Sequence, residues 1–374
     1  MSHEIDITQA EYYMQECFEL ANKALGRTSP NPLVGAIVLD KNGNPVGKGY
    51  HEKAGSPHAE CVALDKAGVL SKGGTLIVNL EPCCHIGKTP PCTEQIIKSG
   101  IKQVIFSNTD PHLPSGVCGE DVLKKNNIKI IKGLLEEEGK EINKFFLKWV
   151  KQKLPWITLK LAQTMDGKVA LKDKTQRWIT SDEAKDVTFQ LRNTYDAVLT
   201  TASTVLADNP QLTVRDIQYS RNPVRVILDT KLQTDPSSNV YKDNAKVFLV
   251  TKKGHLPDKL NAYKKVNDLL GVVECNVDSY GLINVREVFE KLAEENILSV
   301  LIECGPRFAG FLLQERLLDQ YILFLAPTIF NDTDKMEGIV FNSNGLETKP
   351  IKFSLFNYKP IGNDFMLDCR VIKE

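Results

Sequence analysis

The sequence predicts an α/β protein of two domains, and three observations support this prediction. The chain has 374 residues, which is more than a single hydrophobic core usually serves. Short apolar runs of strand length alternate with segments of helical period, as expected where helices cover a sheet. A polar stretch ending in proline, residues 151–155, separates two such series. We therefore expect one domain over residues 1–150 and a second over residues 151–374.

The first domain is expected to begin with a helix over residues 7–25, because its apolar residues recur at helical spacing. Thr8 and Glu11 have the spacing of a capping box, and Gly26 suits the position after a helix. A second helix is expected from Ser56-Pro57, with serine as N-cap and proline at the first helical position.

Between these helices, two apolar runs at residues 34–39 and 45–50 predict a β-hairpin. They flank Asn42-Gly43, a dipeptide that favours a type I′ turn, which needs positive φ at both central residues. The same reasoning places the remaining elements of the first domain as follows: strands at 75–80, 104–107 and 128–131, a helix from Pro90-Pro91, and a closing helix over 136–150.

The second domain continues the alternation of apolar runs and helical segments. Its predicted strands and helices are the following: strands at 157–162, 197–200, 224–229, 247–250, 300–303 and 322–325, and helices at 285–295 and 308–318.

Composition excludes several classes of protein. Lys plus Arg equals Asp plus Glu at 47 each, so the chain lacks the basic excess of a dedicated nucleic-acid binder. We see neither a signal peptide nor an apolar run near the roughly 20 residues of a membrane span. The nine cysteines then argue against a disulfide framework and for a reducing compartment. We expect a cytoplasmic protein.

A metal centre is predicted by His58, Cys83 and Cys92. A catalytic zinc site takes three protein ligands and keeps a fourth position for water. Each of the three residues lies where a helix is expected to begin, so all three can point to one spot, and the helix dipoles favour thiolate. Cys84 is the alternative second thiol, but neighbouring residues rarely bind one tetrahedral ion together, which favours Cys92.

Glu60 follows His58 by two residues. It can therefore reach a water molecule bound to the metal without being a metal ligand. It can take the proton of that water and deliver it to a ring nitrogen and to leaving ammonia. This is the His-x-Glu and Pro-Cys-x-x-Cys pattern of zinc deaminases, except that Ile86 stands where the last cysteine belongs. A closed structural site completed by Cys84 or His85 is the alternative, and it leaves Glu60 without a purpose.

Long motifs then recur in order along both halves of the chain. They are Thr28–Gly35, Pro57–Glu60, Glu81–Cys92, Lys160–Gly167, Trp178–Ser181, Thr204–Pro210, Leu212–Arg215 and Glu303–Pro306. Together they resemble the bifunctional deaminase–reductases of riboflavin biosynthesis. In that family the second zinc thiolate follows the first by nine residues, which is the position of Cys92.

The resemblance implies a cytidine-deaminase-like three-layer α/β/α domain followed by a dihydrofolate-reductase-like α/β domain. It implies zinc-dependent deamination of 2,5-diamino-6-ribosylamino-4(3H)-pyrimidinone 5′-phosphate, then NADPH-dependent reduction of the ribosyl chain to give 5-amino-6-ribitylaminouracil 5′-phosphate. One Zn²⁺ would be held by His58, Cys83 and Cys92, with Glu60 as the catalytic residue. The chain has no Gly-x-Gly-x-x-Gly, so a Rossmann site is not expected.

Further contacts are carried over by position in the motifs. The pyrimidine pocket of the deaminase would be lined by Asn31, His85 and Lys88. The NADPH contacts would be Ala162, Trp178, Thr204, Asp208, Thr230, Gly305, Pro306, Arg307, Phe308, Ala309, Gly310 and Phe311. The contacts to the substrate of the reductase would be Gln176, Arg192, Leu212, Arg215 and Glu303. Of these, Arg192 and Arg215 suit the 5′-phosphate, because guanidinium binds phosphate bidentately.

Departures from the family pattern occur at Gln176, Arg307 and Cys84. None of them removes a residue that the chemistry requires. The expected partner is a small phosphorylated pyrimidine, with neither nucleic acid nor membrane, and the family resemblance implies a homo-oligomer. The rival hypothesis is a single-activity nucleoside or tRNA deaminase whose C-terminal half is not a reductase.

Overall fold

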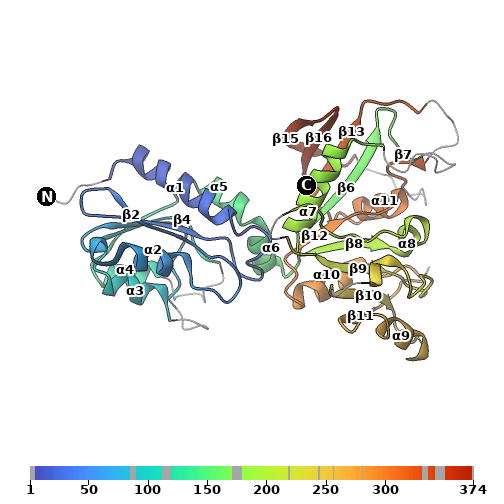
Figure 1. The fold of residues 1–374 in the computed structure, drawn as a ribbon, viewed down its shortest axis with the longest axis horizontal. Coiled ribbons are helices and arrows are strands. Elements are labelled where there is room, and N and C mark those ends of the chain that lie inside the picture. Colours follow the sequence, from blue (N-terminus) through green and yellow to red (C-terminus); the bar gives the residue numbers. More distant parts are fainter. Residues whose placement is uncertain are drawn as a thin grey trace. The chain divides into compact units, whose positions relative to one another are not determined.

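The computed structural model describes residues 5–84, 90–111, 119–170, 179–217, 220–242, 245–255, 257–279, 281–330, 336–341 and 350–372. The chain divides into two compact units, Met1–Lys153 and Leu154–Glu374. The boundary predicted at residue 150 falls inside a helix, α6 (Lys144–Gln152), at the end of the first unit. Each unit is described by itself (Figure 1).

The first unit is built on one mixed sheet. Its strands are β1 (Gly35–Leu39), β2 (Pro45–Tyr50), β3 (Thr75–Leu80), β4 (Gln103–Asn108) and β5 (Lys129–Lys132). Their order across the sheet is β2-β1-β3-β4-β5. β1 runs antiparallel to β2 and to β3, whereas β3, β4 and β5 are parallel to one another.

Helices cover both faces of this sheet, which gives three layers. They are α1 (Ile7–Asn22), α2 (Ala59–Ala67), α3 (Cys92–Lys98), α4 (Gly119–Lys125), α5 (Glu136–Ile142) and α6. Successive residues of β1 point to opposite faces: Ala36 and Val38 join the core under α2 and α3, and Ile37 and Leu39 join the core under α1. The α/β/α class predicted for this half is confirmed.

Three local predictions in this unit need correction. α1 is capped by Asp6, whose carboxylate accepts a hydrogen bond from the Gln9 amide at 2.9 Å, so Thr8 is not the cap. The hairpin has positive φ at Gly43 but not at Asn42, so its turn is not type I′; residues 40–44 connect the two strands, whose register shifts between Val38 and Leu39. The predicted helix from Ser56-Pro57 begins later, with His58 as its N-cap.

The closing helix predicted over 136–150 is two helices that meet at Asn143. The Asn143 side-chain oxygen accepts from the Leu33 amide at 2.8 Å, and its amide nitrogen donates to the Leu33 carbonyl at 3.0 Å. The side chain thus pairs with the backbone that leads into β1. This tertiary pairing accompanies the break between α5 and α6.

The second unit contains a nine-stranded sheet. Its strands are β6 (Trp156–Thr164), β8 (Ala197–Thr201), β9 (Val224–Leu228), β10 (Val247–Lys252), β11 (Leu270–Cys275), β12 (Ser299–Ile302), β13 (Gln320–Ala326), β15 (Phe353–Ile361) and β16 (Asp364–Val371). The order is β11-β10-β9-β8-β12-β6-β13-β16-β15. The strands from β11 to β13 are parallel to their neighbours, whereas β16 is antiparallel to both β13 and β15.

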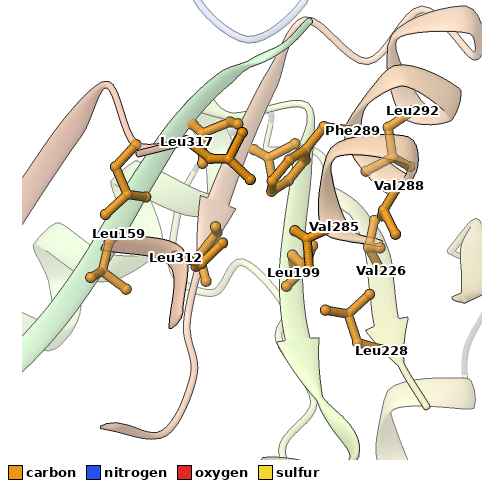
Figure 2. Close-up of a cluster of buried hydrophobic side chains, with 14 of the residues drawn as sticks. Leu159, Leu199, Val226, Leu228, Val285, Val288, Phe289, Leu292, Leu312 and Leu317 are labelled. Atoms are coloured by element: carbon orange, nitrogen blue, oxygen red, sulfur yellow. The ribbon is translucent and has the colours of Figure 1, made fainter. Parts of the chain in front are cut away.

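The helices of this unit are α7 (Asp182–Thr194), α8 (Ala202–Asp208), α9 (Pro257–Lys264), α10 (Val285–Glu294) and α11 (Pro306–Gln314). Figure 2 shows the main core, in which Val285, Val288, Phe289 and Leu292 of α10 and Leu312 of α11 lie against strand residues such as Leu199 and Val226. A second cluster packs α7 against β13 and β16 on other side chains.

Several elements of this unit were not predicted from the sequence. They are α7, α8, α9, β11, the C-terminal hairpin β15-β16, and a short antiparallel pair formed by β7 (Lys168–Ala170) and β14 (Met336–Glu337). The predicted α/β class of this half is confirmed. Within the described ranges, every helix is too short or too polar to cross a bilayer.

Candidate active sites

The three predicted zinc ligands meet at one point in the first unit. His58 precedes α2, Cys83 follows β3, and Cys92 is the first residue of α3. The expectation that Cys83 also begins a helix is wrong, because the described residues 81–84 are not helical. The Nδ1 atom of His58 lies 3.2 Å from Cys92 Sγ and 3.5 Å from Cys83 Sγ. All three potential ligand atoms lie within 4.8 Å of one another.

These separations fit a tetrahedral zinc ion. Zinc bonds of about 2.0–2.3 Å to nitrogen and sulfur place neighbouring ligand atoms roughly 3.5–3.8 Å apart. One imidazole and two thiols are also the donor types that zinc prefers in a catalytic site. Cys92 is fully buried, whereas His58 and Cys83 line a pocket. The three side chains therefore suit a metal ion whose remaining position faces that pocket.

Close packing of α2 on β2 fixes the position of this centre. A Cβ atom at Gly49 would lie 2.5 Å from the Ala59 carbonyl oxygen, and one at Gly47 would lie 2.1 Å from that of Ala63. Only glycine permits the helix backbone to approach the strand this closely. Because His58 caps this helix, the two glycines set where its imidazole lies.

The thiols differ in their electrostatics. Hydrogen bonds with Cys92 and, to a smaller extent, with His58 together lower the pKa of Cys83 to about 4, against the effect of burial. The hydrogen bonds with Cys61 and Cys83, together with burial, raise the pKa of Cys92. Without a metal, Cys83 is thus held as a thiolate and Cys92 as the thiol that donates a hydrogen bond to it. A cation coordinated by both sulfur atoms would deprotonate both.

Glu60 lies in the first turn of α2 and its side chain is buried. Burial raises the pKa of the Glu60 carboxyl, and the charge of Cys83 adds to this effect. The residue also lines the pocket beside His58 and Cys83. A carboxyl whose pKa is raised is suited to accept a proton and return it.

The pocket beside these residues has a volume of about 510 Å³, which is sufficient for a small-molecule ligand. Asn31 lines it, together with His51, Phe146 and Trp149. The predicted contacts His85 and Lys88 lie outside the described residues.

His51 determines how the Asn31 amide is oriented. The Pro57 carbonyl oxygen can only accept, so His51 donates to it through Nδ1 at 3.1 Å. Its Nε2 atom then accepts from the Asn31 amide nitrogen, also at 3.1 Å. The Asn31 oxygen is left free of this bond. Sequence reasoning missed His51 because a single histidine after a strand has no motif to mark it.

Two further cysteines lie near the centre. Cys61 Sγ is 3.8 Å from Cys92 Sγ, but Cys61 is not part of the group whose atoms all lie within 4.8 Å. Cys84 does not belong to that group either. Of the two thiols that the sequence offered as the second ligand, the structure brings Cys92 to the centre.

In the second unit, the predicted cofactor residues gather at the carboxyl ends of parallel strands, where α/β sheets bind ligands. Ala162 lies in the last part of β6. The Gly305–Phe311 segment follows β12, Thr204 and Asp208 belong to α8 after β8, and Thr230 follows β9. The predicted contact Trp178 lies outside the described residues.

The Gly305–Phe311 segment has the form of an anion-binding turn. Gly305 is the N-cap of α11 and Pro306 its first residue, so the first amides of the helix are directed past the end of β12. Gly310 is required on the other side, because a Cβ atom there would lie 2.0 Å from the Val340 carbonyl oxygen.

Arg192 and Glu303 form a buried pair at the same edge. Arg192 Nε lies 2.6 Å from one Glu303 oxygen and Nη2 lies 2.9 Å from the other, while Nη1 donates to the Thr213 carbonyl at 3.0 Å. Burial opposes the ionised form of Glu303, but the Arg192 guanidinium outweighs it, and the pKa of Glu303 is lowered. With these donors engaged, Arg192 holds Glu303 in place, and its predicted contact to a substrate phosphate is disfavoured.

Lys160 in β6 is a charged neighbour of this pair that received no role from sequence reasoning. Burial lowers the pKa of its ammonium group, whereas the Glu303 carboxylate raises it. Lys160 is the first residue of the motif Lys160–Gly167, and this position was the only sign in the sequence that it could have a function. Of the other predicted substrate contacts, Leu212 is buried, Arg215 is exposed, and Gln176 lies outside the described residues.

Family models match both halves of the chain. Residues 7–108 match the cytidine and deoxycytidylate deaminase zinc-binding region. Residues 155–367 match the RibD C-terminal domain.

Relatives and solved structures match over nearly the full length. The chain is 39% identical to a riboflavin biosynthesis protein RibD of Aquifex aeolicus, covering 98% of this chain and 99% of that protein. It is 35% identical to RibD of Escherichia coli, covering 86% and 88%. A Thermotoga maritima structure, described as a diaminohydroxyphosphoribosylaminopyrimidine deaminase/5-amino-6-(5-phosphoribosylamino)uracil reductase, superposes with a TM-score of 0.84 at 36% identity, covering 98% and 99%. Acinetobacter baumannii RibD gives 0.87 at 29% identity, covering 98% and 100%.

Proposed function

The chain belongs to the RibD family of bifunctional deaminase–reductases of riboflavin biosynthesis, and from this premise we propose how its residues divide the two reactions. The deaminase site lies in Met1–Lys153 and the reductase site in Leu154–Glu374. The observation that carries the proposal is the convergence of His58, Cys83 and Cys92 beside a buried Glu60 on one pocket.

The deaminase site takes 2,5-diamino-6-ribosylamino-4(3H)-pyrimidinone 5′-phosphate and replaces its 2-amino group with oxygen. His58, Cys83 and Cys92 hold one Zn²⁺, which when bound lowers the pKa of water to about 7 and so supplies hydroxide at neutral pH. Glu60 accepts the proton of the attacking water at its carboxylate. It donates this proton to the ring nitrogen as the C–O bond forms. It then accepts the second proton, from the new hydroxyl group on the ring carbon, and donates it to the departing amine, so that the C–N bond breaks, ammonia leaves and a carbonyl group remains.

The surrounding residues position the ring. The Asn31 oxygen, oriented by His51, presents an acceptor to an N–H group of the pyrimidine. Phe146 and Trp149 supply apolar wall to the same pocket. His85 and Lys88 complete the substrate contacts as the family resemblance implies.

The reductase site converts the ribosyl chain to ribityl, giving 5-amino-6-ribitylaminouracil 5′-phosphate. NADPH, when bound, supplies the hydride. The cofactor contacts are those named above, with the first amides of α11 at its pyrophosphate. Glu303 and Lys160 are the charged groups at the substrate, Arg192 positions Glu303, and Arg215 remains exposed for the 5′-phosphate. Gln176 and Leu212 complete the substrate contacts.

The partner is a small phosphorylated pyrimidine, without nucleic acid or membrane, and the protein assembles with copies of itself. The cysteines of the described residues are free thiols, which supports a reducing compartment and hence the cytoplasm. The alternative of a single-activity deaminase is not favoured, because the C-terminal half matches a reductase domain.

The purified chain, given the diaminopyrimidine with and without NADPH, tests both halves of the proposal. We expect a mass change of deamination without NADPH and the ribityl product with it. Glu60→Gln should retain zinc, lose deamination by at least about 100-fold, and still reduce the deaminated substrate. If Glu60→Gln deaminates normally, the assignment of the proton shuttle is wrong, and if no ribityl product forms, the reductase assignment is wrong.

A further inference from the structure

A basic pocket lies beyond the last predicted cofactor contact of the second unit. It has a volume of about 340 Å³ and is lined by Lys231, Lys252, Gly254, His255 and Lys259. These residues come from the turn after β9, the end of β10, and the segment that enters α9. Among the described residues that line it, none is acidic, so the pocket offers three ammonium groups to an anion.

The Thr230 carbonyl oxygen connects the segments that line this pocket. It accepts a hydrogen bond from His255 Nε2 at 3.0 Å and another from Thr251 Oγ1 at 3.2 Å. The turn after β9 and the segment before α9 are therefore tied together, and the lysines project from a built framework.

Asp229 is a buried acid two residues before Lys231, and it does not line the pocket. The two carboxylate oxygens of Asp229 accept hydrogen bonds from the Gln233 and Thr234 amides at 2.9 and 2.8 Å, and from the Thr234 hydroxyl. Asp229 thus stabilises its own turn.

The position of the pocket follows the order of the strands. The predicted cofactor contacts lie after β6, β12, β8 and β9, which are neighbours in that order. The next strand, β10, ends at Lys252. At about 4.8 Å per strand, the end of β10 lies roughly 14 Å from the end of β12, so an extended dinucleotide laid along this edge brings its far end to the basic pocket.

We propose that Lys231, Lys252 and Lys259 bind the 2′-phosphate on the adenosine ribose of the cofactor and so select NADPH over NADH. This inference rests on the proposed reductase function. A phosphate monoester carries close to two negative charges at neutral pH, and three mobile ammonium groups around a fixed backbone match that charge. NADH has a hydroxyl group there and gains nothing from the lysines. The 2′-phosphate and free inorganic phosphate are both phosphate anions, so the test below distinguishes between them.

The test compares Lys252→Gln and Lys259→Gln with Lys253→Gln as a matched control. The Lys253 ammonium lies 3.1 Å from the Asn276 side-chain oxygen and does not line the pocket. Dissociation constants for NADPH and NADH are measured with the full chain by fluorescence, and KM values for both in the reductase reaction. Adenosine 2′,5′-bisphosphate, 5′-AMP and inorganic phosphate serve as competitors of NADPH binding.

Each pocket variant should weaken NADPH binding about fivefold and the double variant about 25-fold, since these exposed charges are screened by solvent. NADH binding and the KM of the pyrimidine should stay unchanged, and Lys253→Gln should behave as wild type. Adenosine 2′,5′-bisphosphate should outcompete 5′-AMP in wild type and lose that advantage in the double variant.

Equal losses for NADPH and NADH, or no loss for either, would overturn the proposal. Competition by inorganic phosphate as strong as that by adenosine 2′,5′-bisphosphate would identify a free-phosphate site and also overturn it. A wild-type chain that binds NADPH through the lysines but forms no ribityl product would refute the proposed reductase function and leave this subsite intact.

Discussion

Replacing Gly49 with alanine should disable the deaminase site although residue 49 touches neither metal nor substrate. The added Cβ would lie 2.5 Å from the Ala59 carbonyl oxygen, 2.7 Å from the Ala63 amide nitrogen and 2.8 Å from the Val62 Cβ. Ordinary contact begins near 3.4 Å, so α2 must move away from β2 by about 0.9 Å. The obstructing atoms are mostly backbone, so a change of rotamer offers no relief.

The expected cost follows from what α2 carries. Overpacking of this kind destabilises a core by about 1–3 kcal/mol. His58 and Glu60 move with the helix, whereas Cys83 and Cys92 belong to other segments. Metal–ligand distances tolerate only about 0.2 Å, and a misplacement of about 1 Å in an active site costs roughly 100-fold in rate.

Zinc per chain, deaminase kcat and reductase kcat are measured on Gly49→Ala beside Lys48→Ala, a change at an exposed position of the same strand. We expect Gly49→Ala to bind zinc more weakly and to deaminate about 100-fold more slowly, with reductase kcat as the internal reference. Lys48→Ala should retain both activities. A Gly49→Ala chain with full zinc content and normal deamination would show that the close packing of α2 on β2 does not set the geometry of the site.

Two further predictions concern residues that hold others in place. Arg192→Leu leaves the Glu303 carboxylate buried without its partner, which costs about 3–5 kcal/mol and lowers the apparent Tm of the reductase unit by about 2–4 °C per kcal/mol. Because the pKa of Glu303 is lowered in the folded protein, this stabilisation is complete above the ordinary pKa of Glu and is lost as the pH falls through the folded one. The Tm difference between wild type and Arg192→Leu should therefore narrow in acid, and a constant difference would contradict the pairing. His51→Ala removes the acceptor that orients Asn31, so the KM for the diaminopyrimidine should rise about tenfold with zinc content unchanged, and an unchanged KM would refute that role.

Most strands were predicted correctly because they are buried on one or both faces of a sheet. Burial gives their sequences the apolar runs, or the alternation of apolar and polar residues, by which strands are recognised. β3, for example, is buried at all of its residues, and its bounds match the predicted 75–80. The C-terminal hairpin β15-β16 escaped prediction for the opposite reason. Most of β15 is exposed, including Leu355, Phe356 and Tyr358, so its sequence lacks the alternation of a half-buried strand.

Helix ends depended on tertiary contacts that the sequence does not display. Ser56-Pro57 has the composition of a helix start, yet α2 begins after His58, where the chain turns toward Cys83 and Cys92. Likewise, no local signal marks Asn143 as the point where two helices meet, because its partner Leu33 lies 110 residues away. In both places a contact distant in sequence overrides local propensity.

The composition of the metal centre was visible in the sequence, but its surroundings were not. His58, Glu60 and Cys83 stand in recognisable motifs, whereas His51 and the lysines of the basic pocket become a set only when strands are placed side by side. Arg192 illustrates the converse. The family resemblance and the chemistry of guanidinium predict a phosphate contact, whereas in the structure its guanidinium donates hydrogen bonds to Glu303 and to the Thr213 carbonyl.

The most direct test of the central claim is the zinc content of Cys92→Ser beside that of Cys84→Ser and Cys61→Ser, measured together with deamination. Wild type, Cys84→Ser and Cys61→Ser should each carry one zinc ion per chain and remain active, while Cys92→Ser should lose both the metal and the deaminase activity. A Cys92→Ser chain that keeps its zinc while Cys84→Ser loses it would contradict the assignment of the metal centre.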